Sequence, residues 1–425
     1  MKKLFFLFSL TVFPLISQAQ ISQKNVTKII KTLSSDSMRG RQAFSPEIWD
    51  AANFIADEFS TVGLKPLKGD DDYLQEFTMQ AFSLKDAKVQ VAGESIMDEN
   101  YFAITNNEDV HWTDPDDVSV KYIDPGEDFR TKLSSYNDLE KDLVVFVDAS
   151  HADMFNRFKP YFSRPSYVFA DDKHYNKLFI LAPKTDHFNI QLTKKVQEQK
   201  LANVAGMIEG KRKDEKVLFS AHYDHIGIQQ PVEGDSIANG ANDDASGTAA
   251  VIELAGHFAQ QGQPERTLVF VAFTAEEMGG YGSQYFSKQL NPDHIVAMFN
   301  IEMIGKPATD GPNSAWVTGF DRSSFGKLLQ KSAEGTKYKF YPDPYSQQNL
   351  FYRSDNATLA RLGVPAHSIS TTPIDVDEDY HQVSDEIETL NLSHLTNTIE
   401  AIAKAADGIV SGKDTPTRVD TATVE

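Results

Sequence analysis

The chain has 425 residues, more than one domain usually contains, and 40% of them are hydrophobic, which is enough for a substantial core. Its 61 acidic residues outnumber the 41 basic ones and give a net charge of −20, which argues against nucleic acid or an anionic membrane surface as partner because like charges repel. The chain contains no cysteine, so disulfides are excluded and any bound metal must be held by histidine, aspartate and glutamate.

The first 19 residues have the pattern of a cleavable signal peptide. Lys2 and Lys3 precede an apolar run from Leu4 to Ile16, and small residues lead up to Ala19. The apolar run is shorter than the roughly 20 residues that a membrane-spanning helix needs. We therefore predict cleavage after Ala19, no membrane anchor, and a location in the periplasm or outside the cell.

The following residues predict helices over 22–62 and then a strand at 73–80. The apolar positions in the second half of the helical stretch share one helix face, and Gly63 follows as a stop signal. Residues 83–186 have a different texture of short apolar runs, aromatic residues and turn clusters. This change of texture predicts an inserted β-rich module over residues 83–186.

From residue 187 to residue 411, apolar runs of strand length alternate with helical patterns. These runs lie at 217–221, 267–273, 296–301 and 366–370, and a helix is predicted between the first two. Such alternation predicts an α/β three-layer sandwich, in which helices flank a largely parallel mixed sheet. Residues 20–82 and 187–411 would form this one discontinuous domain. The polar tail, 412–425, lacks apolar periodicity and is predicted to be disordered.

Histidines and carboxylates follow three of the predicted strands at the point where each strand ends. His222 and Asp224 follow the first, Glu276 and Glu277 follow the second, and Glu302 follows the third. Ligands of open α/β sheets bind beyond the carboxyl ends of the strands. We therefore expect these side chains, which lie far apart in the sequence, to converge at one edge of the sheet.

Each of these groups also has a purely structural interpretation when it is taken alone. A histidine near an aspartate is commonly a core or surface pair, and Asp243 lies in a turn where it could cap the next helix. Glu276 and Glu277 could be exposed charges. At the end of a buried strand, however, two adjacent glutamates allow a division of labour, in which one binds metal and the other accepts a proton.

Five motifs in this order resemble the co-catalytic zinc exopeptidases of the superfamily that includes bacterial leucyl aminopeptidases, glutamate carboxypeptidases and transferrin-receptor-like proteins. The motifs are HYDH at 222–225, GANDDASG at 240–247, AEE at 275–277, NIEMIG at 300–305 and DYHQVSD at 379–385. Apart from the insert, the resemblance extends from about residue 27 to about residue 410. It implies a metallo-exopeptidase that acts on peptides.

The resemblance also implies a ligand set for two zinc ions per chain. His222, Asp243 and Glu302 would hold one ion. Asp243, Glu277 and His381 would hold the other, with Asp243 and a water shared between the two ions.

The remaining roles are likewise implied by the resemblance. Glu276 would be the general base that activates the bridging water, and Asp224 would orient His222. Tyr352 is a candidate for stabilising the oxyanion, and a buried aromatic residue is an equal interpretation of it. The peptide bond that follows Asp243 would be cis.

The chain departs from the family pattern at two positions. Glu302 stands where relatives usually have aspartate, and Asn356 stands where many have histidine, so we expect altered zinc coordination and an altered substrate pocket. His225 and His367 are interpreted as structural residues. The insert at 83–186 has the place and length of a protease-associated domain.

The favoured function is a zinc-dependent aminopeptidase that removes N-terminal residues from peptides. A glutaminyl-cyclase-like acyltransferase with a single zinc ion is an alternative within the same fold. A dipeptidase or carboxypeptidase is a second alternative, and a carboxypeptidase for acidic C-termini would need an arginine-rich pocket. A binding protein without catalysis is disfavoured because this chain retains all five ligands and the base.

Overall fold

The computed structural model describes residues 21–424 except 68, 105–108, 114, 171 and 174. The chain divides into two compact units, a first unit of residues up to 76 and from 202 onwards, and a second unit of residues 77–201. The signal peptide predicted at residues 1–19 lies outside the described residues. In the part of the chain that is described, no helix has the length and apolar character needed to cross a membrane.

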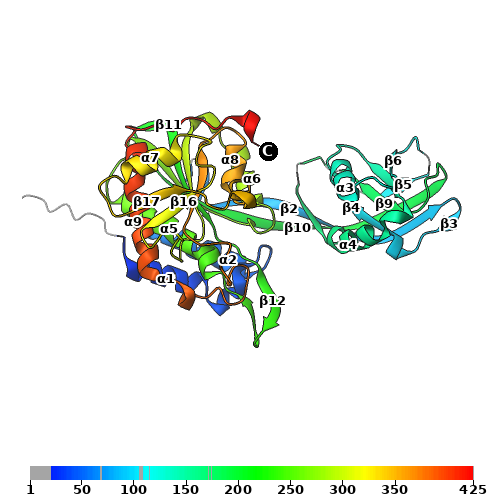
Figure 1. Cartoon of the computed structure of the whole chain (residues 1–425), viewed down its shortest axis with the longest axis horizontal. Coiled ribbons are helices and arrows are strands. Elements are labelled where there is room, and N and C mark those ends of the chain that lie inside the picture. Colours follow the sequence, from blue (N-terminus) through cyan, green and yellow to red (C-terminus); the bar gives the residue numbers. More distant parts are fainter. Residues whose placement is uncertain are drawn as a thin grey trace, which may run out of the picture. The chain divides into compact units, whose positions relative to one another are not determined.

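A mixed β-sheet forms the centre of the first unit (Figure 1). Its strands are β1 (Lys65–Pro66), β10 (Phe188–Ile208), β11 (Arg212–His222), β14 (Arg266–Phe273), β15 (Ile295–Ile301), β16 (Ser314–Val317), β17 (Lys339–Pro342) and β18 (Ala366–Ser370). Strands β14, β11, β15 and β18 lie side by side and run parallel. Strands β10 and β16 pair antiparallel with β14 and β18, so the sheet is mixed, as predicted.

Helices cover both faces of this sheet (Figure 1). One face packs against α1 (Gln23–Leu33), α2 (Glu47–Thr61), α5 (Ser246–Ala259), α7 (Phe325–Ser332) and α9 (Leu392–Val410). The other face packs against α6 (Tyr281–Gln289) and α8 (Asn356–Ala360). The predicted three-layer α/β architecture is therefore confirmed.

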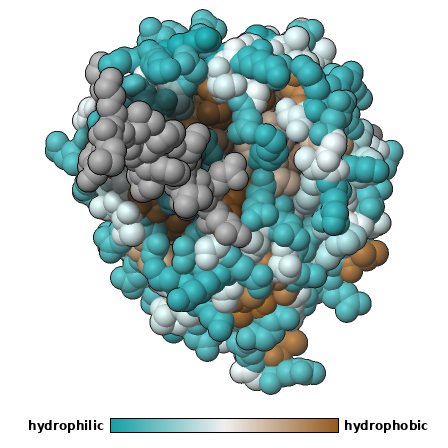
Figure 2. Space-filling view, turned by 90° about the vertical axis from the view of Figure 1, so that its left-hand side faces the viewer, coloured by the Kyte–Doolittle hydropathy of each residue, from teal (hydrophilic) through white to brown (hydrophobic). Residues whose placement is uncertain are grey.

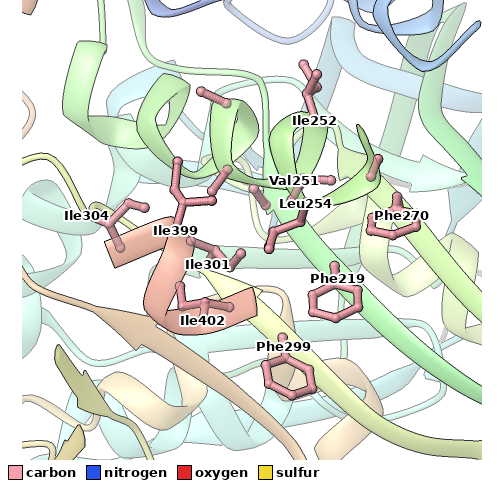
Figure 3. Packing of buried hydrophobic residues seen from close by; sticks show 14 of the residues in the cluster. Phe219, Val251, Ile252, Leu254, Phe270, Phe299, Ile301, Ile304, Ile399 and Ile402 are labelled. Carbon is pink, nitrogen blue, oxygen red and sulfur yellow. The ribbon is translucent and has the colours of Figure 1, made fainter. Parts of the chain in front are cut away.

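Alternation along the buried strands separates the two hydrophobic cores. In β14, Phe270 belongs to the core beneath α5, whereas its neighbour Val271 belongs to the core beneath α6 and α8. Figure 3 shows Phe219, Phe270 and Phe299, which come from three adjacent strands, next to the apolar face of α5. The ring of Phe219 lies 5.3 Å from that of Phe270 and 4.9 Å from that of Phe299. This aromatic layer fixes the parallel strands whose ends carry the site.

The second unit begins and ends within two long strands, β2 (Leu74–Val91) and β10, so the unit is wider than the predicted insert at 83–186. Its other strands are β3 (Glu94–Ser95), β4 (Tyr101–Ile104), β5 (Val110–Trp112), β6 (Ser119–Ile123), β7 (Leu143–Val147), β8 (Ser166–Phe169) and β9 (Lys177–Leu181). It also contains two helices, α3 (Phe129–Asn137) and α4 (Ala152–Phe162), which the β-rich prediction missed. Because β6, β7 and β9 are parallel, their connections must cross over, and α3 supplies the crossover from β6 to β7.

The C-terminal residues 412–424 pack against the first unit, which differs from the disordered tail predicted from composition. Val419 is buried, and its amide donates to the carbonyl of Gly363 at 3.1 Å. The buried guanidinium of Arg266 donates to the carbonyl of Asp414 and the hydroxyl of Thr415, at 2.7 and 2.6 Å. These partners come from distant parts of the chain, so a polar composition by itself gave no sign of them.

Where Figure 2 is not grey, the face that it shows is mainly hydrophilic, with several patches of hydrophobic residues. A hairpin of β12 (Gly227–Val232) and β13 (Asp235–Ala238) extends from the first unit, and it carries the exposed side chains of Ile228 and Val232. This hairpin joins the end of β11 to the loop that precedes α5.

Candidate metal centre

The carboxyl ends of the parallel strands bring the predicted site residues to one edge of the sheet. His222 is the last residue of β11, and Glu302 directly follows β15. Glu276 and Glu277 lie in the turn after β14, and Asp243 lies in the loop before α5. Parallel neighbours end at the same edge, so these side chains converge as expected.

The first half of the site is built around His222, whose side chain is buried. Its Nε2 lies 3.2 Å from Oδ1 of Asp243 and 3.2 Å from Oε1 of Glu302. Its Nδ1 lies 3.1 Å from the backbone carbonyl of Asp224, which fixes the orientation of the ring. Nε2 therefore faces the two carboxylates.

The second half of the site lies on the other side of Asp243. His381 Nε2 lies 3.3 Å from Oδ2 of Asp243 and 3.1 Å from Oε2 of Glu277. The two oxygens of Asp243 thus face different histidines. The structure brings together all five predicted ligands, and the peptide bond between Asp243 and Asp244 is cis, as the resemblance implied.

A chain of hydrogen bonds holds Glu302 from behind. The hydroxyl of Ser354 donates to its Oε2 at 2.7 Å, which leaves Oε1 facing His222. Ser354 in turn accepts from Asn300, which also donates to Ser368, and the hydroxyl of Ser368 donates to Asn356. Asn356 is fully buried in this network and does not itself line the site cavity, but it accepts from Ser368, which does.

Asp224 contacts His222, as the resemblance implied, but its carboxylate has closer partners. Its carboxylate accepts from the backbone amides of Glu276 at 3.0 Å and Glu277 at 3.3 Å, and it lies 3.8 Å from Nδ1 of His222. Burial raises the pKa of Asp224 to about 6, against the opposing charge of His222. Asp224 therefore positions the Glu276–Glu277 turn directly, whereas its backbone carbonyl orients His222.

Asp244 also lies within ligand distance of His222 and Glu302, although sequence reasoning did not name it as a ligand. Its Oδ1 accepts from the backbone amides of Gly247 and Met303 at 3.0 and 2.9 Å. These bonds hold the start of α5 against the segment after β15. Since both oxygens of Asp243 face histidines and one oxygen of Asp244 is committed to backbone amides, we assign the ligand role to Asp243.

His225 is the residue of the site that sequence reasoning missed. Its side chain is buried, and its Nδ1 lies 2.9 Å from Oε1 of Glu277 and 3.8 Å from Oδ2 of Asp243. Its place in the HYDH motif, just beyond the end of β11, was the available signal. Because a buried histidine is more commonly a core residue, the sequence favoured a structural role for His225.

A cavity of about 70 Å³ opens beside the predicted ligands. Apolar side chains of Met303, Trp316, Leu350 and Ile374 line part of it, and Tyr380 and Arg353 also contribute to its wall. Tyr352 is not among the lining residues, and its hydroxyl lies 3.5 Å from the carbonyl of Thr423. Tyr380 does line the cavity, and its ring stacks on that of His381 with the ring centroids 4.0 Å apart.

The electrostatics of the site separate the two adjacent glutamates. Burial raises the pKa of Glu276 well above its usual range, and the carboxylates of Glu302 and Asp355 add to this rise. Burial and Asp243 also act to raise the pKa of Glu277, but its hydrogen bonds with His225 and His381 outweigh them, and the result is a lowered pKa. Burial and nearby carboxylates raise the pKa of Tyr380, so its hydroxyl keeps its proton.

The donor set fits zinc. Two ligand atoms on a tetrahedral zinc ion with bonds of about 2.0–2.1 Å lie roughly 3.3–3.4 Å apart, and the pairs around Asp243 lie 3.2 to 3.3 Å apart. Imidazole nitrogen and carboxylate oxygen are both zinc ligands. Several carboxylates buried together are stable only when they are paired or bind a cation, which the same residues would satisfy.

A mixed sheet that gathers histidines and carboxylates at the carboxyl edge of its parallel strands defines an α/β domain built to hold metal ions. Residues 203–406 match the model of peptidase family M28, and the chain therefore carries a domain of this family. The resemblance inferred from the five motifs is thus confirmed.

Solved structures of similar fold cover nearly the whole chain. An aminopeptidase from Aneurinibacillus sp. strain AM-1 has a TM-score of 0.55 and 18% identity, and it covers 96% of this chain and 97% of its own. A zinc aminopeptidase from Bacillus subtilis has a TM-score of 0.56 and 18% identity, with coverage of 93% and 97%. At this level of identity the similarity shows a shared fold.

Curated relatives match a shorter part of the chain. A probable zinc metalloprotease of Leptosphaeria maculans is 33% identical over 114 residues, which are 26% of this chain and 26% of the relative. A probable zinc metalloprotease of Pyricularia oryzae is 39% identical over 109 residues, or 25% of this chain and 21% of the relative. The chain thus matches about a quarter of the length of these relatives.

Proposed function

We propose that this protein is an exported aminopeptidase that uses two zinc ions to remove N-terminal residues from peptides. The observation that carries the proposal is the position of Asp243, whose two oxygens lie 3.2 Å from His222 and 3.3 Å from His381. A carboxylate placed between two such sets of ligands suits a pair of ions that share it. Export rests on the N-terminal sequence pattern.

Glu276 is the residue that moves protons in this proposal. Bound zinc would polarise the scissile carbonyl as a Lewis acid and make the attacking water more acidic. Glu276 accepts a proton from that water as its oxygen bonds to the carbonyl carbon. Glu276 then delivers the proton to the leaving nitrogen as the carbon–nitrogen bond breaks. A raised carboxylate pKa suits both transfers.

Tyr380 is the side chain best placed to stabilise the developing oxyanion. Its hydroxyl keeps its proton, and the residue lines the cavity beside His381. A hydrogen-bond donor aimed at a developing negative charge lowers the barrier of acyl transfer. Tyr380 therefore takes the role for which Tyr352 had been the candidate.

The cavity wall supports an exopeptidase that binds apolar side chains. Met303, Trp316 and Leu350 offer apolar contacts to a substrate side chain beside the predicted ligands. The surrounding carboxylates favour the positive charge of a free α-amine. We therefore expect peptides with an apolar N-terminal residue to be the best substrates.

The position of Arg353 in the cavity wall favours a carboxypeptidase as a second candidate. Its exposed side chain lines the cavity, and its Nη2 lies 3.4 Å from the hydroxyl of Tyr380. A guanidinium there could bind the carboxylate of a peptide C-terminus. It is the only arginine or lysine of that cavity wall among the described residues, whereas recognition of an acidic C-terminal residue calls for more than one cation.

The test uses peptides blocked at one end. An aminopeptidase cleaves a C-terminally amidated Leu-peptide and spares its N-acetylated form, whereas a carboxypeptidase has the opposite preference. We expect cleavage of the amidated peptide only, together with loss of activity on chelation and recovery on addition of zinc. Cyclisation of an N-terminal glutamine peptide with a single bound zinc would favour the acyltransferase alternative and overturn the proposal.

A further inference from the structure

His225 is a buried histidine that contacts two predicted ligands without being one of the five that the family resemblance implies. Its Nδ1 lies 2.9 Å from Oε1 of Glu277, within hydrogen-bond distance, and 3.8 Å from Oδ2 of Asp243. Two arrangements are compatible with these distances. Nδ1 could bind a metal ion, or it could carry a hydrogen and donate it to Glu277.

The other ring nitrogen decides between the two arrangements. If Nδ1 of His225 bound a metal, Nε2 would carry the hydrogen and would need an acceptor, as metal-binding histidines normally have. Nε2 of His225 is buried and has no hydrogen-bond partner. His222 differs, because its second nitrogen lies 3.1 Å from the carbonyl of Asp224. A buried N–H group without an acceptor is rare, so the hydrogen of His225 belongs on Nδ1.

We propose that His225 is a positioning residue that donates from Nδ1 to Oε1 of Glu277 and thereby makes Glu277 a ligand through one oxygen. Oε2 of Glu277 remains, 3.1 Å from Nε2 of His381, on the side where the second zinc would be held. The inference rests on the proposed zinc centre and goes beyond the five ligands and the base. It gives the HYDH motif a role for its second histidine.

In the other half of the site, a hydrogen-bond donor likewise occupies one oxygen of a glutamate. Ser354 donates to Oε2 of Glu302 at 2.7 Å and leaves Oε1 facing His222. In both halves, therefore, a donor occupies one glutamate oxygen and the other oxygen faces a histidine. Two long carboxylate side chains are thus held so that each can supply a single oxygen, which suits the four-coordinate preference of zinc.

The backbone around His225 holds its ring in this place. The amide of His225 donates to the carbonyl of Arg41 at 3.2 Å. The buried guanidinium of Arg41 donates to the carbonyls of Tyr223, Asn239 and Gly240, which ties together the segments on either side of the ring. A side chain at Gly240 would come within 2.6 Å of the His225 ring, so this glycine makes room for it.

The test measures zinc affinity in three variants of the full chain. His225→Phe and His225→Leu remove the donor with larger and smaller apolar side chains, so one of them remains informative if the other fails to fold. His225→Asn retains an N–H donor near the position of Nδ1. Zinc is titrated against a competing chelator to obtain both dissociation constants, and the melting temperature of each chelated protein is compared with that of the wild type.

We expect the second zinc to bind about 10–100-fold more weakly in His225→Phe and His225→Leu, the usual cost of losing a partner of a metal ligand. His225→Asn should stay within about threefold of the wild type, and the first zinc should keep its affinity in all three variants. Wild-type affinity in the apolar variants would overturn the inference. Equal weakening in His225→Asn, or equal weakening of both zinc ions, would overturn it as well, because the donor would then not be the cause.

Ser354→Ala supplies the matched contrast, because it removes the corresponding donor from Glu302. It should weaken the ion on the His222 side and spare the ion on the His381 side. The wild-type titration separates this inference from the proposed function. A wild-type chain that binds fewer than two zinc ions contradicts the proposed centre itself. If the wild type binds two ions and the His225 variants bind both with unchanged affinity, only the inference is contradicted.

Discussion

Glu276 and Glu277 are adjacent and chemically identical, and their surroundings give them opposite properties. The pKa of Glu276 is raised by burial and by the carboxylates of Glu302 and Asp355. The pKa of Glu277 is lowered because its hydrogen bonds with His225 and His381 outweigh burial. A carboxylate with a raised pKa carries protons well, and one with a lowered pKa remains charged and suits a cation.

The first prediction separates these two roles. Glu276→Gln should reduce kcat by about 10²–10⁴-fold, the usual contribution of a general base, while the protein retains its bound zinc. Glu277→Gln should lose the second zinc. Turnover on an aminoacyl substrate and the metal content after dialysis provide the measurements. Wild-type turnover in Glu276→Gln would show that another group accepts the proton.

The second prediction concerns His367, which is buried between two hydrogen-bond partners. Its Nδ1 lies 2.8 Å from the carbonyl of Thr318, and its Nε2 lies 2.7 Å from the hydroxyl of Ser323. Burial lowers its pKa to about 4. The unfolded chain therefore takes up this proton first as the pH falls below ~6.5. The associated stability is present above ~6.5 and is lost as the pH falls towards 4.

We expect His367 to contribute on the order of 2 kcal/mol to the fall in unfolding free energy between pH 7.5 and pH 5. His367→Asn retains a donor for Thr318 and does not titrate, so its stability should fall by that much less over the same range. Urea unfolding of both proteins at the two pH values, with chelator present, gives the difference. Equal falls in both proteins would contradict the assigned cause.

At the scale of elements, the strands that carry the site are held by one aromatic layer. Phe219 of β11 lies between Phe270 of β14 and Phe299 of β15 (Figure 3). The ring of Phe258 in α5 lies 5.4 Å from that of Phe219. All four side chains are buried. This packing keeps β11 in register with β14 and β15. It therefore keeps His222, at the end of β11, beside the site residues that follow those two strands.

The third prediction tests this layer. Phe219→Ala should lower the free energy of unfolding by about 3–5 kcal/mol, because it removes a large buried ring and leaves a cavity. Phe219→Leu, which fills most of the space, should cost about 1 kcal/mol. Denaturant unfolding measures both. Similar small losses in the two variants would mean that the strands are held mainly by other contacts.

Elements with a strong apolar period were predictable, and those with a weak one were not. Strand β18 coincides with the predicted run at 366–370, and its residues are all buried. Helix α3 buries only Phe129 and Leu133 and has a weak apolar face. Its helical state follows from the parallel pairing around it, which no local pattern records. Helix α4 fully buries only Phe155, but Phe158 and Phe162 pack beside it at helical spacing, so this apolar pattern was present in the sequence and was not used.

At the scale of the whole molecule, the C-terminal segment closes the first unit. Arg266, at the start of β14, donates to Asp414 and Thr415 of this segment as well as to the carbonyl of Ile409. Val419 is buried against the same unit. The segment therefore satisfies a buried guanidinium that would otherwise lose two acceptors.

The fourth prediction tests this role of the C-terminus. Deletion of residues 413–425 should lower the free energy of unfolding by about 2 kcal/mol or more, since hydrogen bonds to a buried charge are lost. Deletion of residues 422–425 alone retains Asp414, Thr415 and Val419 and should have little effect. The measurement compares the urea midpoints of the two truncated proteins with that of the full chain. An unchanged midpoint in the longer deletion would show that the C-terminal segment does not stabilise the fold.

The sequence by itself determined the α/β fold and the position of His222, Glu276, Glu277 and Glu302 at the ends of predicted strands, because apolar periodicity is a local property. The full set of five ligands was implied by the resemblance of its motifs to a known family. The tertiary structure decided that Tyr380 and not Tyr352 lines the cavity, and it decided the backbone partners of Asp224 and Asp244 and the contact between His225 and Glu277. These depend on which loops meet beyond the sheet edge. Such meetings are set by packing between residues that are distant in the chain, and no local pattern encodes them.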